Sequence, residues 1–180
     1  TLIILFISII NFNPNYKVRY IQQFTEILTK KGLNYYLDNS IYGAHFEVAK
    51  KIFKENKTFG VGIKNFRVES YSDEHNINHK YNDRRGNTHP HQVHYEFLSE
   101  TGLVGYFSFL LFIIGSFYIA IKTFLKNKNL FQLSGILYVF ACLFPLLPTG
   151  SFFSTYSSGL FWLNYAIMVG YINNSSKVEN

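Results

Sequence analysis

The feature that most restricts the fold of this chain is an apolar run at residues 103–121, which contains no charged side chain. A helix needs about 20 mostly apolar residues to cross the hydrocarbon core of a bilayer, so this run is long enough to span one. Two further apolar stretches follow at residues 130–147 and 152–172. In contrast, 13 of the 17 Lys and Arg residues lie between Lys17 and Arg85. This asymmetry predicts a polar domain joined to membrane spans.

The chain is therefore predicted to be an all-α polytopic membrane protein, in which a large, mostly helical extracytoplasmic loop is followed by three transmembrane helices. It opens with an apolar stretch at residues 1–12 that is too short to cross a bilayer. We expect this stretch to be the end of a helix that starts upstream, so that the chain is the C-terminal part of a larger protein. The expected divisions are a transmembrane helix end at 1–12, a periplasmic loop domain at 13–97, transmembrane helices at 98–121, 130–148 and 149–172, a cytoplasmic loop at 122–129 and a cytoplasmic tail at 173–180.

The orientation follows from the short connections, because short loops rich in Lys and Arg stay in the cytoplasm. Lys122, Lys126 and Lys128 place the connection after the first full span on that side. The uncharged turn at residues 148–151 is then outside, and so is the long loop at 13–97. In a bacterium this predicts a multi-pass protein of the inner (cytoplasmic) membrane whose active face is periplasmic.

One helix of the long loop can be placed from the sequence. Ser40 suits an N-cap, and apolar residues at helical spacing predict a helix over about 41–55. The other side of this helix is basic, with Lys50, Lys51, Lys54 and Lys57. Such a face fits either a solvated surface or a site for anionic lipid headgroups or a lipid-linked pyrophosphate. The polar segment 71–87 has no apolar period and fits either a functional lid or disorder.

Three histidines gather just before the first full span, at His89, His91 and His94. Pro90 suits the first position of a helix, which would place His91 in the first turn. The positive end of the helix dipole disfavours a charged imidazole there, and a neutral imidazole is what a general base requires. A single histidine in such a place is more often structural. For a cluster at a membrane boundary, a structural role and a functional role are about equally favoured.

Other residues around this cluster have simpler interpretations. Glu96 and Glu100 lie one helical turn apart and share a face. Gly102 either ends this helix or serves as a small contact within a longer one. Gly60 and Gly62 allow a tight turn, and a lone Gly-x-Gly is too weak a pattern to indicate a phosphate site.

No metal site is expected. His75 and His79 have the i, i+4 spacing of a helix, but the segment around them does not look helical. Zinc needs three or four converging ligands. The one cysteine, Cys142, excludes a disulfide within the chain and a cysteine-based zinc site.

Two segments resemble the O-antigen ligase and O-antigen polymerase superfamily of membrane proteins. Residues 59–66 read FGVGIKNF and match the family pattern FGxGxxxF. Residues 88–105 read THPHQVHYEFLSETGLVG and are similar to HxHNxxLExxxExGxxG. The stretch FPLLPTGSFF at 144–153 is similar to the end of the ligase-type members. The resemblance covers about residues 40–172 and implies a large periplasmic loop followed by membrane spans.

The resemblance also implies roles for single residues. His91 matches the proposed catalytic histidine, although Gln92 stands where Asn is usual. The family uses arginines in its outer loops, at least one of them upstream of the present start, so the chain alone is expected to be inactive. The expected site has catalytic His91 and Glu96, substrate-binding His89, His94, Lys64, Arg67, Arg84 and Arg85, and structural Gly60, Gly62, Gly102 and Gly105.

The implied reaction is a glycosyl transfer that needs no nucleotide sugar, no metal and no other cofactor. A glycan moves from undecaprenyl pyrophosphate to a hydroxyl of lipid A–core or a similar acceptor, and direct displacement inverts the anomeric centre. The partners are then the lipid-linked glycan donor, the acceptor and the membrane, with no nucleic acid. Three alternatives stay open: an O-antigen polymerase, a non-catalytic membrane protein that binds lipid headgroups or a partner, and a metal-dependent membrane enzyme.

Overall fold

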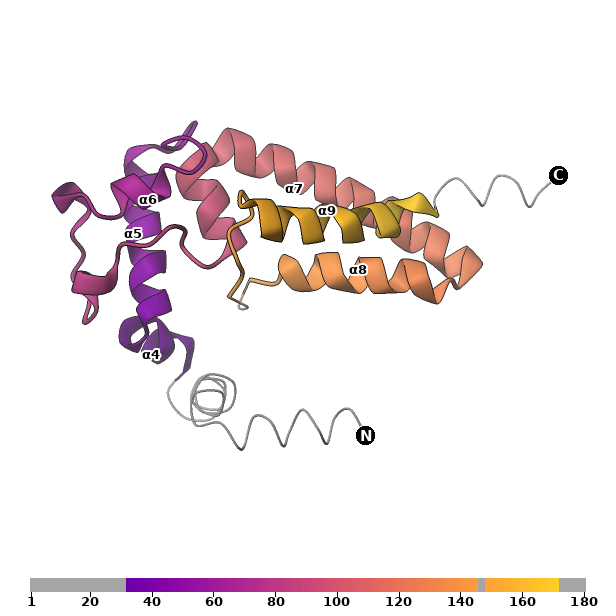
Figure 1. Ribbon diagram of the computed structural model, residues 1–180, viewed down its shortest axis with the longest axis horizontal. Coiled ribbons are helices and arrows are strands. Elements are labelled where there is room, and N and C mark those ends of the chain that lie inside the picture. The colour runs from indigo at the N-terminus through magenta and orange to yellow at the C-terminus, as the bar shows by residue number, and fades with distance from the viewer. Residues whose placement is uncertain (1–31, 146–147, 172–180) are drawn as a thin grey trace.

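The computed structural model describes residues 32–145 and 148–171, and these form helices with no strand among them. The first group is α4 (Gly32–Asn39), α5 (Ile41–Glu55), α6 (Phe66–Glu69) and two short 3₁₀ helices, η2 (Asp73–His75) and η3 (Asn82–Arg84). The second group is α7 (Val93–Asn127), α8 (Leu130–Cys142) and α9 (Thr155–Gly170). Figure 1 shows the first group as a compact unit at one end of a long bundle made by the second. The predicted helix end at 1–12, the predicted loop up to residue 31 and the whole predicted tail at 173–180 lie outside the described residues, which begin at 32 and end at 171.

Helix α5 is the centre of the compact unit. It covers the predicted range 41–55, and the Ser40 hydroxyl accepts a hydrogen bond from Gly43 N–H at 3.0 Å, so the predicted cap is confirmed. The apolar stripe of α5 forms a core with α6: Val48, Ala49, Ile52 and Phe66. Burial of apolar surface, at about 25 cal/mol per Å², holds these elements together.

The polar segment 71–87 is folded against α5. Its anchor is His75, which is buried and places Nε2 3.0 Å from a carboxylate oxygen of Glu55. Arg85 holds the far end, because its guanidinium donates to the Ser72 carbonyl at 2.9 Å. These hydrogen bonds connect the segment to α5 and its two ends to each other.

Helix α7 changes direction at Gly102, whose φ of 63° and ψ of −164° are not helical. The bend divides α7 into residues 93–101, here called the arm, and residues 103–127, here called the shaft. The arm packs against α5, with Tyr95 stacked on Phe46 at a centroid distance of 4.6 Å. The boundary predicted between residues 97 and 98 thus falls inside the arm, and the chain turns only at Gly102.

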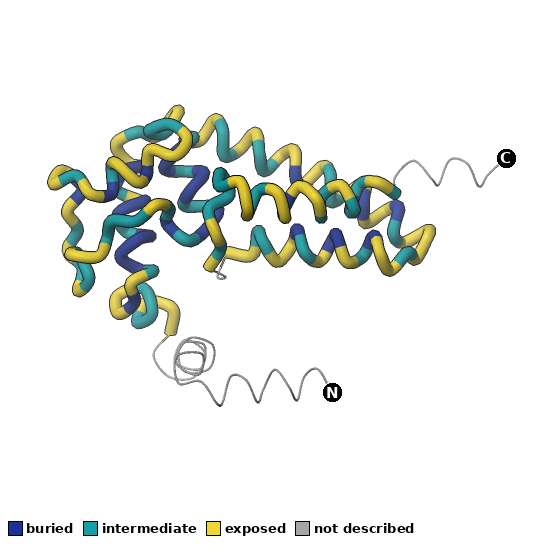
Figure 2. Tube along the Cα trace, viewed as in Figure 1, coloured by how far each residue is buried: buried dark blue, intermediate teal, exposed yellow. Residues whose placement is uncertain are grey.

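The shaft packs with α8 and α9 through a small apolar core: Ile113, Ala120, Ile136, Val139, Phe161 and Met168. Gly135 lets α8 and α9 approach closely, because a Cβ there would lie 2.7 Å from the Asn164 carbonyl oxygen. Large apolar side chains also cover the outside of the bundle, where exposed residues predominate in Figure 2. Leu111, for example, is 71% exposed. An apolar exterior over a whole bundle is unusual for a soluble protein.

Among the described residues, α7 is the one helix long and apolar enough to cross a membrane. Its most apolar window is only 11% buried, whereas the core helix of a soluble protein would be mostly buried. Helix α8 has 13 residues and α9 has 16. At about 1.5 Å per residue both are shorter than a hydrocarbon core of about 30 Å. Within the span predicted at 130–148, α8 covers Leu130–Cys142.

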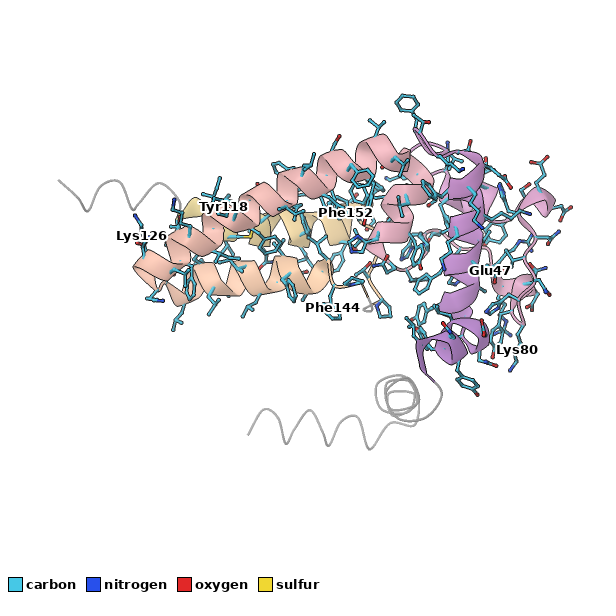
Figure 3. The ribbon with its side chains drawn as sticks, turned by 180° about the vertical axis from the view of Figure 1, so that it is seen from behind. Glu47, Lys80, Tyr118, Lys126, Phe144 and Phe152 are labelled. Atoms are coloured by element: carbon cyan, nitrogen blue, oxygen red, sulfur yellow. The ribbon has the colours of Figure 1, made fainter. Side chains whose placement is uncertain are left out.

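The connection predicted at 122–129 is mostly helix, because α7 continues to Asn127. The turn consists of Lys128, at φ 51°, and Asn129. The Asn129 side chain accepts from the first N–H groups of α8 and so caps it. Figure 3 shows Lys126 at the end of the bundle away from Glu47 and Lys80 of the compact unit.

Candidate functional site

The bend in α7 is completed by the loop between α5 and α6, residues 56–65, here called the α5–α6 loop. A bend leaves carbonyl and N–H groups of the helix without their usual partners, and buried groups of this kind must be satisfied elsewhere. Four backbone hydrogen bonds of 2.8–3.2 Å do this: Val61 N–H to Ser99 O, Gly62 N–H to Glu100 O, Leu103 N–H to Lys57 O and Val104 N–H to Thr58 O. The loop therefore replaces the missing helical bonds on both sides of the bend.

Two of the predicted structural glycines meet where the loop touches the bend. Gly60 and Gly102 both have positive φ, at 66° and 63°. A Cβ at Gly60 would lie 2.4 Å from the Glu100 carbonyl carbon, and a Cβ at Gly102 would lie 2.5 Å from Thr58 C. Only glycine combines this backbone conformation with such a close approach.

The other two predicted glycines have different surroundings. Gly62 has φ 96°, and a Cβ there would lie 3.1 Å from the Asn65 side chain. Gly105 lies inside the shaft, and its Cβ would lie 2.4 Å from Thr101 Oγ1. Gly62 thus serves the loop, whereas Gly105 leaves room for the last side chain of the arm.

Glu100 ties the arm to the α5–α6 loop. Its carboxylate accepts from Lys64 N–H at 2.7 Å and from Phe66 N–H at 3.2 Å. Burial raises the pKa of Glu100, while these two N–H groups and the charges of Arg67 and Lys64 act in the opposite direction. The predicted substrate-binding residue Lys64 thus contacts the arm through its backbone, and its side chain is exposed.

Glu96, predicted as catalytic, ties the arm to the segment before α9. Its carboxylate accepts from the Ser151 hydroxyl at 2.5 Å and from Phe152 N–H at 2.7 Å. Burial raises the pKa of Glu96 to about 7, and the nearby Glu100 adds to the rise, although the bonds to Ser151 and Phe152 oppose it. Two residues earlier, Thr149 N–H donates to the carbonyl oxygen of His91 at 2.8 Å. Both Glu96 oxygens are therefore occupied in holding a segment that also holds His91.

His91 lies just before the helix, so its predicted place in a first turn begun by Pro90 is wrong. The arm begins at Val93, and the Gln92 side chain caps it by accepting from Tyr95 N–H at 3.0 Å. His91 has φ 58°, which is not helical. Gln92 performs the capping function that Asn also favours, so this departure from the family pattern leaves the cap in place.

The rings of three histidines meet at this point. His91 lies 4.1 Å from His89 and 5.3 Å from His45, measured between ring centroids. The Tyr42 ring meets His91 edge-on at 5.4 Å. His45 and Tyr42 come from α5, so the cluster joins the compact unit to the start of α7.

The side chain of Asn87 defines the protonation of this cluster. Its Oδ1 accepts from Thr88 N–H at 2.6 Å, so its Nδ2 faces His91 Nε2 at 3.0 Å and His45 Nε2 at 3.4 Å. An amide NH₂ group only donates, so both Nε2 atoms must carry a lone pair. His45 Nδ1 must then be the protonated nitrogen, and it donates to Arg85 O at 2.9 Å.

Burial is the main cause of the low proton affinity in this cluster. It lowers the pKa of His45, although the bond to Arg85 O acts in the opposite direction. It also lowers the pKa of His89, and the charge that His45 would carry lowers it further. Burial therefore disfavours a charged imidazole at His45 and at His89, the two rings beside His91.

The sequence patterns did not identify two residues of this cluster, His45 and Asn87. His45 lies four and seven positions before Ala49 and Ile52, on the buried stripe of α5. A histidine in an apolar helical stripe is a signal that could have identified it. Asn87 carries no comparable pattern, because its role comes from contacts with residues on two elements.

His94, predicted to bind substrate, faces another direction. Its Nε2 donates to Leu143 O at 2.8 Å, and the Tyr106 hydroxyl donates to its Nδ1 at 3.1 Å. Its Nδ1 thus connects the arm to the shaft, and its Nε2 connects the arm to the end of α8. The structure brings together His89 and His91 but not His94.

The predicted cationic residues are spread over the compact unit. Arg67 and Arg84 are exposed, and Arg84 lies 3.9 Å from the Asp83 carboxylate. The Arg85 guanidinium is bonded to carbonyl groups of its own segment, including Asn82 O at 3.1 Å. Arg85 therefore orders the loop that carries Asn87.

The described residues contain no group of three or more His, Cys, Asp or Glu side chains placed to hold a metal ion. His75 lies against Glu55, as noted above, and His79 Nε2 donates to Leu37 O at 2.8 Å. His75 and His79 therefore have separate structural contacts.

No family model, curated protein or solved structure matches this chain. The function is therefore inferred from the geometry above and from the motifs in the sequence. The geometry adds one observation to those motifs: residues 59–66 and 149–152, which are far apart in sequence, both contact the segment 88–105 at or beside the arm of α7.

Proposed function

We propose that this protein is a membrane glycosyltransferase of the O-antigen ligase type. It would move a glycan from undecaprenyl pyrophosphate to a hydroxyl of lipid A–core, or a similar acceptor, at the periplasmic face of a bacterial inner membrane. The observation that carries the proposal is the contact of His91 Nε2 with the Asn87 amide at 3.0 Å, held where a polar helical unit meets an apolar bundle. A base at this position could reach a lipid-linked donor whose sugar lies just outside the bilayer.

The bundle supports the membrane part of the proposal. Helix α7 is long and apolar enough to span, and large apolar side chains cover the outside of the bundle. We assign α8 and α9 as the helical cores of two further spans, at residues 130–148 and 149–172. Lys126 and Lys128 at the far end would face the cytoplasm. The compact unit and the histidine cluster are then periplasmic.

The chemistry needs one proton acceptor and stabilisation of the leaving group. The acceptor hydroxyl would take the place of the Asn87 amide as the donor to His91 Nε2. Its oxygen attacks the anomeric carbon as its proton passes to His91, and the bond from that carbon to the pyrophosphate oxygen breaks with its electron pair. The pyrophosphate leaves from the opposite face, so the anomeric centre inverts. Well-placed bases contribute about 10²–10⁴-fold in rate.

The exposed cations of the compact unit are candidates to bind the departing pyrophosphate. Lys64, Arg67 and Arg84 are exposed, unlike Arg85, whose guanidinium is engaged. Positive charge near a leaving pyrophosphate stabilises the transition state without a metal ion. In the same proposal Asn87 and His45 are positioning residues, because the Asn87 amide sets the tautomer of the resting His91 ring and the His45 ring packs beside it.

Complementation tests this proposal. Bacteria that lack their own ligase would express the full-length protein as wild type, as His91→Ala or as His79→Ala, with equal membrane levels verified. We expect the wild type and His79→Ala to restore a glycan ladder on lipid A–core, because His79 lies outside the cluster, and we expect His91→Ala to fail. A full ladder with His91→Ala would contradict the proposal.

The same experiment separates the alternatives. Longer glycans that stay on the carrier lipid, with none on lipid A–core, would identify a polymerase. Transfer that stops after chelation and returns with zinc would identify a metal-dependent enzyme. If no variant changes either glycan pool, while the protein still binds membranes, a non-catalytic role replaces the proposal.

A further inference from the structure

The compact unit exposes an apolar surface close to the bend of α7. Phe59, Ile63 and Val68 are 72%, 59% and 63% exposed. They lie in and just after the α5–α6 loop, which runs beside the bend of α7 (Figure 1). Such large side chains are ordinary when scattered singly, but a group in one short segment indicates a surface that meets something apolar.

Three cations share this segment, and no acid does. Lys57, Lys64 and Arg67 are exposed, and residues 57–68 contain no Asp or Glu. The flanking acids, Glu55 and Glu69, both lie against the buried His75, at 3.0 and 3.5 Å. The resulting surface is both apolar and positively charged. We call it the loop patch: Lys57, Phe59, Ile63, Lys64, Arg67 and Val68.

The basic face of α5 is less suited to bind anions than its sequence suggests. Lys51 Nζ donates to the Asn76 carbonyl at 3.2 Å and also to the Glu74 carbonyl. Lys50 Nζ lies over the Tyr95 ring at 5.5 Å. Lys50 and Lys51 are therefore engaged within the protein, and Lys57 belongs to the loop patch, so among the described residues Lys54 remains as the one exposed and unengaged lysine of the α5 face.

The loop patch is fixed at the level where the apolar shaft begins. Lys57 O and Thr58 O accept from the first two N–H groups of the shaft, those of Leu103 and Val104. Leu103 and Val104 are themselves 38% and 50% exposed, so the apolar surface of the patch continues into that of the shaft. The Glu100 carboxylate, in the arm, accepts hydrogen bonds from the end of the same loop and from the start of α6. The patch cannot move far from the start of the shaft without breaking these bonds.

We propose that the loop patch binds the surface of the bilayer that the shaft crosses. Phe59, Ile63 and Val68 enter the boundary between headgroups and acyl chains, and Lys57, Lys64 and Arg67 contact anionic phospholipid headgroups. The inference rests on the proposed membrane position of α7, but not on glycosyl transfer. Its consequence is a fixed depth for the arm, and thus for the histidine cluster, relative to the lipid surface.

Spin labels on the full chain in lipid vesicles test this inference. Each variant carries Cys142→Ala and one labelled cysteine: Phe59→Cys in the patch, Leu111→Cys on the shaft or Lys80→Cys as the control. Lys80 is exposed and lies on the side of the compact unit away from the bundle (Figure 3). The ratio of collisions with oxygen to collisions with a water-soluble nickel chelate reports the depth of each label.

We expect the Phe59→Cys label to give a ratio several-fold above that of Lys80→Cys and below that of Leu111→Cys. Adding phosphatidylglycerol to phosphatidylcholine vesicles should increase the Phe59→Cys ratio. The triple change Lys57→Glu, Lys64→Glu, Arg67→Glu should remove that increase. A Phe59→Cys ratio equal to that of Lys80→Cys, with Leu111→Cys in lipid, would overturn the inference and leave the membrane position of α7 intact.

Two other outcomes are also decisive. If the Leu111→Cys label is in water, both the membrane position of α7 and the inference are wrong. If the Phe59→Cys label enters the bilayer equally with and without phosphatidylglycerol, the headgroup contact is wrong and the proposal that combines the two is overturned. None of these readings requires transfer activity, so the result is independent of the glycosyltransferase proposal.

Discussion

Glu96 and Glu100 lie one turn apart on the arm of α7, and each is 1% exposed. Glu100 accepts hydrogen bonds from two backbone N–H groups of the compact unit. Glu96 accepts one from the Phe152 backbone and one from the Ser151 hydroxyl. A hydroxyl can turn to donate or accept, whereas a backbone N–H can only donate. The two carboxyl groups are therefore equally buried on one helix but differ in their partners. The partners of Glu96 can adapt to a protonated or amide side chain, whereas those of Glu100 cannot.

The charges around the two groups differ as well. Arg67 and Lys64 lower the pKa of Glu100 against the effect of its burial. No cation among the described residues contributes to the pKa of Glu96, which burial raises to about 7. The contact of the arm with the α5–α6 loop is thus held by the Glu100 carboxylate, whose negative charge is favoured by Arg67 and Lys64. Its contact with the segment that holds His91 depends on a group that titrates near neutral pH.

The largest expected effect comes from disrupting the contact between the bend of α7 and the α5–α6 loop, which Glu100 also holds. Gly102→Ala would place a Cβ 2.5 Å from Thr58 C at a φ of 63°. We expect a loss of about 3 kcal/mol or more in the free energy of unfolding, because left-handed geometry and overpacking each cost about 1–3 kcal/mol. Thermal unfolding in detergent micelles, followed by circular dichroism, measures it.

Gly115→Ala is the matched control, since nothing lies within 4 Å of a Cβ there. In the interior of a helix this change should stabilise by up to about 1 kcal/mol. Equal melting temperatures for Gly102→Ala and the wild type would mean that the bend is not held as described.

Replacing each carboxyl group by an amide tests the comparison directly. Glu100→Gln would turn an NH₂ group toward a backbone N–H, either that of Lys64 or that of Phe66. We expect it to lose about 1–3 kcal/mol of stability. Glu96→Gln can keep both contacts, since its oxygen can accept from Phe152 N–H and its NH₂ can donate to Ser151, so its loss should be below about 1 kcal/mol. Equal losses in chemical unfolding would contradict the distinction between the two sites.

The raised pKa of Glu96 predicts a pH dependence of stability. The folded state holds this proton up to a pH of about 7, whereas the model value for the unfolded group is 4.5. The unfolded state binds fewer protons in this window, so the contribution of Glu96 is fully present below pH 4.5 and is lost as the pH rises to about 7. The difference in melting temperature between wild type and Glu96→Gln should therefore shift against the wild type across this window. A difference that stays constant with pH would mean that Glu96 is ionised throughout.

Ser151→Ala should have the smallest effect. It removes one neutral donor, which costs about 1 kcal/mol. Because the Ser151 bond lowers the pKa of Glu96, its loss should also move the pH-dependent fall in stability to higher pH. In a Glu96→Gln background this movement should disappear. If it persists there, another group is responsible for it.

Local patterns predicted the local parts of the fold. Helix α5 begins after Ser40 and ends at Glu55, as its cap and apolar spacing indicate. The pairing of Glu96 with Glu100 on one face also followed from helical spacing. The helices differ from the spans predicted by apolar length, because α8 ends at Cys142 and α7 continues through the basic stretch that was predicted as a loop.

The candidate site depends on contacts that sequence spacing does not reveal. The Asn87 amide links His45 on α5 to His91, which lies outside any helix. Thr149 reaches His91 from a segment more than fifty positions later. Pro90 suggested a helix start at His91, but the positive φ of His91 moves that start to Val93. Tertiary contacts here outweigh the local preference of proline.

The central claim is that the arm of α7 holds His91 with an unprotonated Nε2. Nitrogen-15 NMR of histidine rings in the full chain, in micelles at about pH 7, tests it, with His91→Gln and His45→Gln to assign the signals. We expect His91 and His45 to show an unprotonated Nε2. A His91 ring protonated on both nitrogens at that pH would remove the base and contradict the account.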